Sequence, residues 1–263
     1  MRADKYFSEH FGSRTKAAEA IDRGLVLING KPIKAKTEIK ETDAITFVEA
    51  EESFVSNGGY KLDRAIKSFD FDCTDKVFAD IGASTGGFTD CLLQNNAKKV
   101  YAIDVGESLL HEKLAGDSRI VSMENTNARY LQKEDFPDEI DGVVTDVSFI
   151  SLRLIFPTIK AILKPNGSAF VLIKPQFECE NKNIGKSGIV ATSSHAAIVE
   201  KVLGYLLENG LYPHGIVNAP IRKGKNIEYI LYCQPNYNGA KTAKQIVDEV
   251  RNFVRRNSLG ELE

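Results

Sequence analysis

One glycine-rich segment limits the possible folds of this chain more than any other feature. The run Asp80–Asp90, DIGASTGGFTD, lies at the end of an apolar segment, Val77–Ile81, and leads into a segment with helical spacing, Gly87–Gln94. A strand that passes through a glycine-rich turn into a helix is where open α/β sheets bind nucleotide-like ligands. The glycines permit the tight turn and let the backbone approach a ligand closely. The segment therefore predicts an α/β fold with a ligand site on this loop.

Strand and helix patterns alternate along the chain after residue 58, which is typical of a mostly parallel sheet. The apolar runs predict strands at Val77–Ile81, Lys99–Asp104, Arg119–Met123, Gly142–Asp146, Ser168–Ile173, Gly215–Asn218 and Ile227–Cys233. The helical patterns predict helices at Tyr60–Ser68, Gly87–Gln94, Ser108–Leu114, Leu152–Leu163 and His195–Asn209. We interpret Leu163–Gly167 and Glu208–Gly210 as helix stops that lead into strands. An amphipathic helix is expected at about residues 241–257.

The first 50 residues follow a different pattern and are predicted to form a separate small domain. Ser13 can cap the first turn of a helix, and Asn29-Gly30 is a typical hairpin-turn sequence. The predicted elements of this domain are a helix at Arg14–Arg23 and strands at Leu25–Ile28, Lys31–Ile33 and Asp43–Val48. Residues 51–58 are polar and are predicted to be a linker. The larger domain would then span residues 59–263.

The charges of the chain are unevenly distributed, although its net charge is only −2. Residues 1–36 carry eight basic and four acidic side chains, and residues 201–263 carry nine and six, so the middle of the chain is acidic. Basic ends indicate a polyanion partner such as nucleic acid, bound away from the acidic middle. A surplus of four positive charges on a small domain also falls within ordinary variation, so charge alone leaves the partner open.

The composition is that of a folded protein outside the membrane, because 43% of the residues are hydrophobic and 27% are charged. No apolar run reaches the roughly 18–20 residues that a membrane helix needs, and the N-terminus has no apolar signal segment. The four cysteines lack the spacing of a zinc site or a disulfide framework: Cys73, Cys91, Cys179 and Cys233. We therefore expect a cytoplasmic protein with no bound metal.

The spacing of the glycine-rich segment favours S-adenosylmethionine over a dinucleotide. The glycines follow G-x-x-x-G-G instead of G-x-G-x-x-G, and Asp80 would place a carboxylate beside a pyrophosphate. The ammonium and sulfonium groups of S-adenosylmethionine suit a carboxylate. Asp104 ends the next strand, where an acid can accept hydrogen bonds from both ribose hydroxyls. The predicted cofactor-binding residues are Asp80, Gly82, Ala83, Ser84, Gly86, Gly87, Phe88, Asp104 and, near the adenine edge, Asn127. A glycine-rich surface turn is the alternative.

Four charged residues are predicted to meet at the same edge of the sheet: Lys61, Asp146, Lys174 and Glu228. Each alone could be a solvated charge, but together they suit methyl transfer to a ribose 2′-hydroxyl. A lysine accepts the hydroxyl proton only if its pKa falls well below about 10.4, which burial and a second ammonium achieve. We assign Lys174 as the proton acceptor and Lys61 as the cation that positions the ribose. Asp146 would hold Lys174, and Glu228 would orient one or both lysines.

These motifs resemble known protein families. The segment from Ser13 to Lys31 is similar to the S-four-type RNA-binding motif, and the rest looks like an FtsJ-type RNA 2′-O-methyltransferase; the combination resembles the TlyA family, historically called hemolysins. The strings that carry the likeness are Gly58–Leu62, Asp80–Asp90, Thr145–Ser151, Lys174–Glu178 and Asn226–Tyr229. The resemblance implies a small RNA-binding domain before a Rossmann-like, seven-stranded methyltransferase domain, with Lys61, Asp146, Lys174 and Glu228 as the catalytic tetrad.

The resemblance also implies a substrate. Family members methylate a cytidine 2′-hydroxyl in large-subunit ribosomal RNA, and some also one in small-subunit RNA, which sensitises ribosomes to capreomycin and viomycin. The partner would be ribosomal RNA within a subunit or a ribosome, and no membrane. Many relatives begin with a longer arm, R-L-D-x-x-L, whereas this chain begins MRADKYF; a shorter chain resembles the form that acts on the large subunit only.

RNA contacts are expected on basic side chains, which position RNA by its phosphates. The candidates are Arg2, Lys5, Arg14, Lys16, Arg23, Lys31 and, beside the active site, Arg64. Two other functions were weighed: an RNA-binding ribosome-assembly factor without catalysis, and a membrane-active hemolysin. The oligomeric state is not determined by the sequence.

Overall fold

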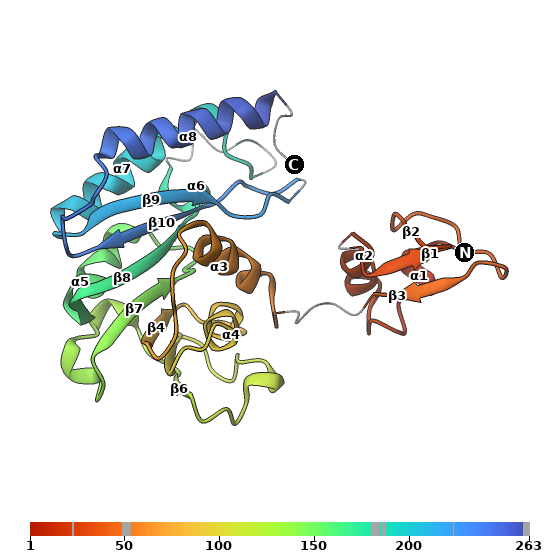
Figure 1. Cartoon of the computed structure of the whole chain (residues 1–263), viewed down its shortest axis with the longest axis horizontal. Coiled ribbons are helices and arrows are strands. Elements are labelled where there is room, and N and C mark those ends of the chain that lie inside the picture. Colours follow the sequence, from red (N-terminus) through yellow and green to blue (C-terminus); the bar gives the residue numbers. More distant parts are fainter. Residues whose placement is uncertain (23, 49–53, 180–184, 186–187, 223, 260–263) are drawn as a thin grey trace. The chain divides into compact units, whose positions relative to one another are not determined.

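The protein falls into two compact units, Met1–Ser53 and Phe54–Glu263, in a computed structural model that describes residues 1–22, 24–48, 54–179, 185, 188–222 and 224–259 (Figure 1). The second unit begins inside the predicted linker 51–58. Phe54 packs against the hydrophobic core of this unit, and the backbone N–H of Val55 donates to the Asp90 carboxylate at 2.7 Å. Residues 54–58 therefore belong to the larger unit, because contacts that their polar composition does not reveal hold them there.

The small unit is built from two helices and a three-stranded antiparallel sheet of order β2-β1-β3. Its elements are α1 (Ala3–Tyr6), α2 (Arg14–Asp22), β1 (Val26–Ile28), β2 (Lys31–Pro32) and β3 (Ile45–Phe47). The N–H of Lys16 donates to Ser13 Oγ at 3.1 Å, which confirms the predicted cap. Asn29 and Gly30 both have positive φ, 52° and 73°, as a two-residue hairpin requires. Helix α1 was not predicted, because one turn is too short for a periodic pattern.

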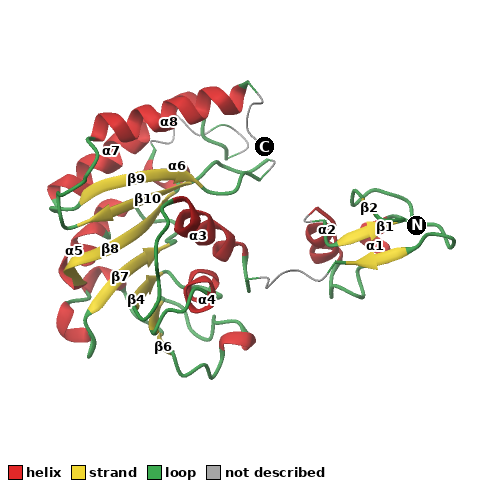
Figure 2. Cartoon of the chain, in the orientation of Figure 1, coloured by secondary structure: helices red, strands yellow, loops and turns green. Residues whose placement is uncertain are grey.

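The larger unit contains a seven-stranded sheet of order β6-β5-β4-β7-β8-β10-β9, which confirms the predicted α/β class (Figure 2). Its strands are β4 (Val77–Ile81), β5 (Lys99–Ile103), β6 (Ile120–Met123), β7 (Ile140–Thr145), β8 (Leu163–Ile173), β9 (Tyr212–Asn218) and β10 (Tyr229–Gln234). Strand β4 pairs in parallel with β5 and β7, and β10 runs antiparallel to both β8 and β9. Every residue of β4 is buried, as a parallel strand covered on both faces requires.

Helices cover both faces of this sheet, as Figure 1 shows. The longer helices are α3 (Asn57–Ser68), α4 (Gly87–Gln94), α5 (Phe156–Ile162), α7 (His195–Glu208) and α8 (Ala243–Ser258). Short helical turns lie at α6 (Pro175–Glu178), Glu112–Leu114, Ala128–Tyr130, Lys133–Asp135, Leu152–Leu154 and Thr192–Ser194. Alternate residues of β4 point to opposite faces: Ala79 packs in the core under α5, α7 and α8, and Phe78 in the core under α3 and α4.

Three local predictions were wrong. The segment Ser108–Leu114 forms only a short 3₁₀ turn, because Ser108 has a left-handed φ of 52° that a helix excludes. The helix expected at Leu152–Leu163 splits into a 3₁₀ turn and α5, with Pro157 in the first turn of α5. The helix does end at Ile162, as the expected stop Leu163–Gly167 predicts, but the strand expected from Ser168 already begins at Leu163, which pairs with Ile140 of β7. Of these, the start of the strand at Leu163 depends on a partner strand that the local pattern does not contain.

Candidate active site

The sheet brings the four predicted catalytic residues to one edge. Asp146 directly follows β7 and Lys174 directly follows β8, so both lie at the carboxyl ends of neighbouring parallel strands. Glu228 immediately precedes β10, whose first residue, Tyr229, pairs with Ile173. Because β10 is antiparallel to β8, its start lies beside the end of β8.

The charged atoms of this cluster are within contact distance of one another. Lys61, from helix α3, places its Nζ 3.2 Å from Asp146 Oδ2 and 2.8 Å from Glu228 Oε2. The Nζ of Lys174 lies 2.5 Å from the other carboxylate oxygen of Asp146, Oδ1. Asp146 therefore bridges the two lysines, whereas Glu228 contacts Lys61 and accepts a hydrogen bond from Gln176 Nε2 at 3.5 Å. The assignment of Asp146 to Lys174 agrees with these contacts, while Glu228 is placed to act on one lysine and not on both.

Lys61 is set up to remain a cation. Burial, the largest single influence, lowers its pKa, but the carboxylates of Asp146 and Glu228 together outweigh burial, so that the pKa of Lys61 is raised above its ordinary value. A group that keeps its proton at neutral pH can hold an oxygen atom by charge and hydrogen bonding but cannot accept a proton. Lys61 is therefore suited to act as a fixed positive charge.

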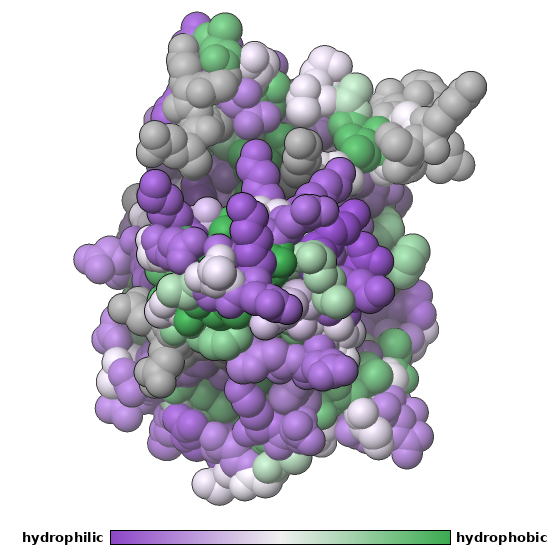
Figure 3. Space-filling view, turned by 90° about the vertical axis from the view of Figure 1, so that its right-hand side faces the viewer, coloured by the Kyte–Doolittle hydropathy of each residue, from purple (hydrophilic) through white to green (hydrophobic). Residues whose placement is uncertain are grey.

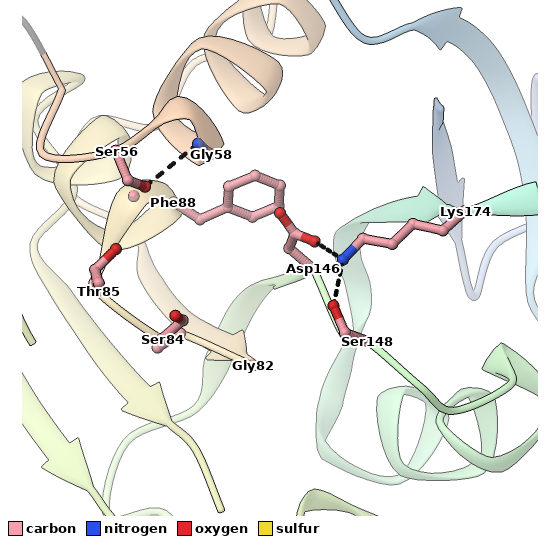
Figure 4. A pocket seen from close by; sticks show the side chains of 11 residues that line it. Ser56, Gly58, Gly82, Ser84, Thr85, Phe88, Asp146, Ser148 and Lys174 are labelled. Atoms are coloured by element: carbon pink, nitrogen blue, oxygen red, sulfur yellow. Dashed lines mark hydrogen bonds and ion pairs between the residues drawn. The ribbon is translucent and has the colours of Figure 1, made fainter. Parts of the chain in front are cut away.

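Lys174 has a second partner that the sequence did not reveal. Its Nζ donates to Ser148 Oγ at 2.7 Å, and its side chain is only 9% exposed. A lysine nitrogen has three positions for protons besides its bond to carbon. Ser148 Oγ takes one of them and Asp146 is an ion-pair partner of the same nitrogen, as Figure 4 shows, so Lys174 can still bond a substrate hydroxyl in the cavity that it lines. Ser148 is two residues from Asp146 in the motif TDVSFIS, and this proximity was the only signal for it in the sequence.

Two adjoining cavities lie beside this cluster. One, of about 180 Å³, is lined by Ser56 and Gly58 from the start of α3, by the glycine-rich loop and by Phe88, Asp146 and Lys174 (Figure 4). The other, of about 740 Å³, is lined by Asp104, Asn127 and the loop 146–151. Gly82, Ser84, Asp146 and Ser148 border both cavities. The pair is large enough for a ligand that extends from the glycine-rich loop to Asn127.

The residues of these cavities suit S-adenosylmethionine. Asp104 accepts from the backbone N–H groups of Ser84 and Gly106, each at 2.9 Å, and ionised carboxylates have further acceptor sites for ribose hydroxyls. Asn127 borders the same cavity, with its side-chain oxygen accepting from the N–H of Arg129 at 3.2 Å. Of the predicted cofactor-binding residues, those that border a cavity are Gly82, Ala83, Ser84, Gly87, Phe88, Asp104 and Asn127.

Asp80 and Gly86 border neither of these cavities. The backbone requires glycine at Gly86, because its φ of +86° lies in the left-handed region that other residues rarely adopt. Asp80 is fully buried; one oxygen accepts from Thr89 Oγ1 at 2.7 Å and the other has no hydrogen-bond partner among the described residues. Burial, partly opposed by the Thr89 hydrogen bonds and reinforced by Asp146 and Asp104, raises the pKa of Asp80 to about 7.

The raised pKa of Asp80 predicts a pH-dependent stability. Folding raises this pKa from 3.8 to about 7, so the native state binds the proton more tightly than the unfolded chain. The contribution of Asp80 to the free energy of unfolding is therefore complete below pH about 4 and is lost as the pH rises through about 7. Relative to the parent protein, Asp80→Asn should gain on the order of 2–3 kcal/mol of stability between pH 5 and pH 8.

Denaturant unfolding of the cofactor-free protein at several pH values measures this difference. Asp70→Asn, at an exposed position, is the matched control and should show no such trend. A stability difference for Asp80→Asn that is the same at pH 5 and pH 8 would contradict the prediction.

The predicted RNA-binding residues lie on the surface, apart from Arg23, which falls outside the described residues. Lys5, Lys16 and Lys31 are exposed. Arg2 and Arg14 are also exposed, but both contact the Asp4 carboxylate, at 2.8 and 3.0 Å. The hydrogen bonds that Arg2 and Arg14 donate to Asp4 lower the pKa of its carboxyl group, and the bond from Arg2 has the larger effect. The two arginines therefore also hold the small unit together.

Figure 3 shows a molecular face on which hydrophilic side chains dominate.

Arg64 of helix α3 is exposed on the larger unit, with its Nη2 3.4 Å from Asn218 Oδ1. Among the described residues, no group of three or more His, Cys, Asp or Glu side chains could hold a metal ion. None of the described helices combines the length and the apolar character needed to cross a bilayer.

The order of this sheet, with one antiparallel strand entering beside the charged cluster, is that of the Rossmann-like methyltransferases. Residues 54–235 match the FtsJ-like methyltransferase family, and residues 1–45 match the S4 domain. The chain belongs to the TlyA family, in which an S4 domain precedes an FtsJ-like methyltransferase domain.

Individual relatives match along most of their length. Hemolysin A of Brachyspira hyodysenteriae is 42% identical, over 88% of this chain and 99% of that protein. The 16S/23S rRNA (cytidine-2′-O)-methyltransferase TlyA of Mycobacterium tuberculosis is 36% identical, over 92% of each chain. A solved structure from Streptococcus thermophilus that carries the name hemolysin is 35% identical, covers 98% of each chain and has a TM-score of 0.72.

Proposed function

We propose that this protein transfers the methyl group of S-adenosylmethionine to the 2′-hydroxyl of a cytidine in ribosomal RNA, with large-subunit RNA as its main substrate. The observation that carries this proposal is the placement of Lys174. Its amino group is held by Asp146 and Ser148, and Lys174 lines the smaller cavity, where its nitrogen can meet a hydroxyl group. The name of the relative from Mycobacterium tuberculosis supports ribosomal RNA and a cytidine 2′-hydroxyl.

The roles of the side chains follow from the cluster. The cofactor supplies a methyl group bound to a positively charged sulfur. In its neutral form, Lys174 accepts the proton of the 2′-hydroxyl while the oxygen forms its bond to the methyl carbon and the carbon–sulfur bond breaks. Lys61 keeps its proton and holds the ribose oxygen. Asp146 fixes both lysines, and Glu228 fixes Lys61, so the four charges nearly cancel when Lys174 is charged.

A substrate assay tests the proposal directly. Purified protein and methyl-labelled S-adenosylmethionine are incubated with ribosomes, separated subunits and protein-free RNA from a strain that lacks the modification. Mass spectrometry of nuclease fragments should detect one 2′-O-methylcytidine in large-subunit RNA. Labelling of a base, or of no ribosomal RNA at all, would refute the proposed reaction. Binding to ribosomes without methyl transfer would favour the assembly-factor function instead.

A further inference from the structure

Glu178 is a buried carboxylate that the catalytic roles above do not use. It ends the short helix α6, one helical turn after Lys174, and its residue is only 3% exposed. Both carboxylate oxygens accept hydrogen bonds from the chain after β7: Oε1 from the N–H of Leu152 at 2.7 Å, and Oε2 from Ser151 Oγ at 2.8 Å. A buried charge is costly unless its hydrogen bonds are satisfied, so these two contacts are the reason it can lie here.

The segment that Glu178 holds is the loop that carries the partners of Lys174. This loop, residues 146–151, begins with Asp146, includes Ser148 and ends at Ser151. Lys174 contacts its beginning through Asp146 and Ser148, and Glu178 contacts its end. The turn from Lys174 to Glu178 therefore contacts the loop 146–151 at both of its ends.

The loop needs such support because its backbone is strained. Phe149 has a φ of +61° and is 91% exposed, so neither glycine nor burial stabilises its left-handed conformation. Strained residues of this kind persist only where the surrounding structure fixes them. On the other side, Lys201 of α7 donates to the backbone carbonyl of Glu178 at 3.0 Å, which anchors α6 itself.

We propose that Glu178 is a positioning residue for methyl transfer: by fixing the end of the loop 146–151, it orients Asp146 and Ser148 and thereby the amino group of Lys174. This inference rests on the proposed function. Misplacing a catalytic group by about 1 Å can lower a rate on the order of a hundredfold. Loss of Glu178 should therefore act on the chemical step: the loop also borders the larger cavity, but Asp104, which would hold the ribose, is fixed by the N–H groups of Ser84 and Gly106 and not by Glu178.

The test uses the full chain and four variants: Glu178→Ala, Glu178→Gln, Ser151→Ala and, as a control on an exposed face of α7, Glu200→Gln. Glu178→Ala should lower kcat between about tenfold and a hundredfold, with unchanged KM for RNA and unchanged Kd for S-adenosylmethionine by calorimetry. Glu178→Gln keeps one acceptor and should recover part of the rate. Glu200→Gln should match the parent protein.

A double variant separates positioning from general stability. If Glu178 acts through Ser148, adding Glu178→Ala to Ser148→Ala should lower kcat by less than the product of the two single effects. Fully multiplicative losses, or an unchanged kcat in folded Glu178→Ala, would overturn the inference. Should Glu178→Ala fail to fold, Ser151→Ala decides, because it removes the hydrogen bond to Glu178 and, besides that, the 3.3 Å bond that Ser151 Oγ accepts from the N–H of Arg153; a lowered kcat supports the inference and an unchanged kcat overturns it. An inactive parent protein would instead refute the proposed function.

Discussion

Replacing Lys174 with alanine should lower kcat for methyl transfer to ribosomal RNA by about 10²–10⁴-fold, the usual effect of losing a general base. Affinity for S-adenosylmethionine should be retained, because the larger cavity and Asp104 do not depend on this side chain. Single-turnover transfer of a labelled methyl group measures the first quantity, and calorimetry measures the second.

A second substitution distinguishes proton transfer from electrostatics. Lys174→Arg keeps the positive charge, but a guanidinium does not lose its proton in a protein, so this variant should be about as inactive as the alanine variant. Substantial turnover by Lys174→Arg would mean that the site needs only a cation here. The control is Lys160→Ala, an exposed lysine of α5 that should leave turnover unchanged.

The second large effect is expected on the small unit. Replacing Lys5, Lys16 and Lys31 together with alanine should raise KM for ribosomal particles, leave kcat unchanged and reduce the slope of log affinity against log salt by about 3, since each phosphate contact contributes about 1. These lysines suit the test better than Arg2 and Arg14, whose contacts with Asp4 also support the fold of this unit.

The matched control removes three exposed lysines from the larger unit: Lys98, Lys113 and Lys244. Methylation of ribosomal particles at several salt concentrations compares the two triple variants. Equal losses in both would show that the overall charge of the chain attracts the RNA, and that the small unit has no special part in binding.

The elements that the sequence predicted well are those whose pattern is local. The apolar run of β4, the glycine-rich loop and the start of α4 are contiguous, and each was placed correctly because its periodicity and turn residues lie within a few positions. The segment Ser108–Leu114 has a similar apolar spacing but is not a helix. The left-handed conformation of Ser108 belongs to a loop whose His111 N–H donates to the Thr85 carbonyl, a contact across 26 positions.

The charged cluster could be predicted because neighbouring parallel strands place their carboxyl ends at the same edge of the sheet. Residues that follow neighbouring parallel strands meet at one edge, so Asp146 and Lys174 could be paired from strand order alone. Ser148 and Glu178 could not, since a serine in a loop and a glutamate after a lysine have no periodic signature. Asp80 illustrates the opposite case: the sequence placed it beside the cofactor, whereas the fold buries it against Thr89.

The sequence by itself determined the class of fold, the two-part organisation and the four charged groups, because hydrophobic periodicity and the order of strand ends are properties of the chain. Only the tertiary structure decided which of these groups contact one another. Which lysine lies between two carboxylates, which contacts a serine, and which buried glutamate supports the loop all depend on distances between residues 26 to 167 positions apart. Such contacts are set by packing and by the need to satisfy buried charges, which no local pattern encodes.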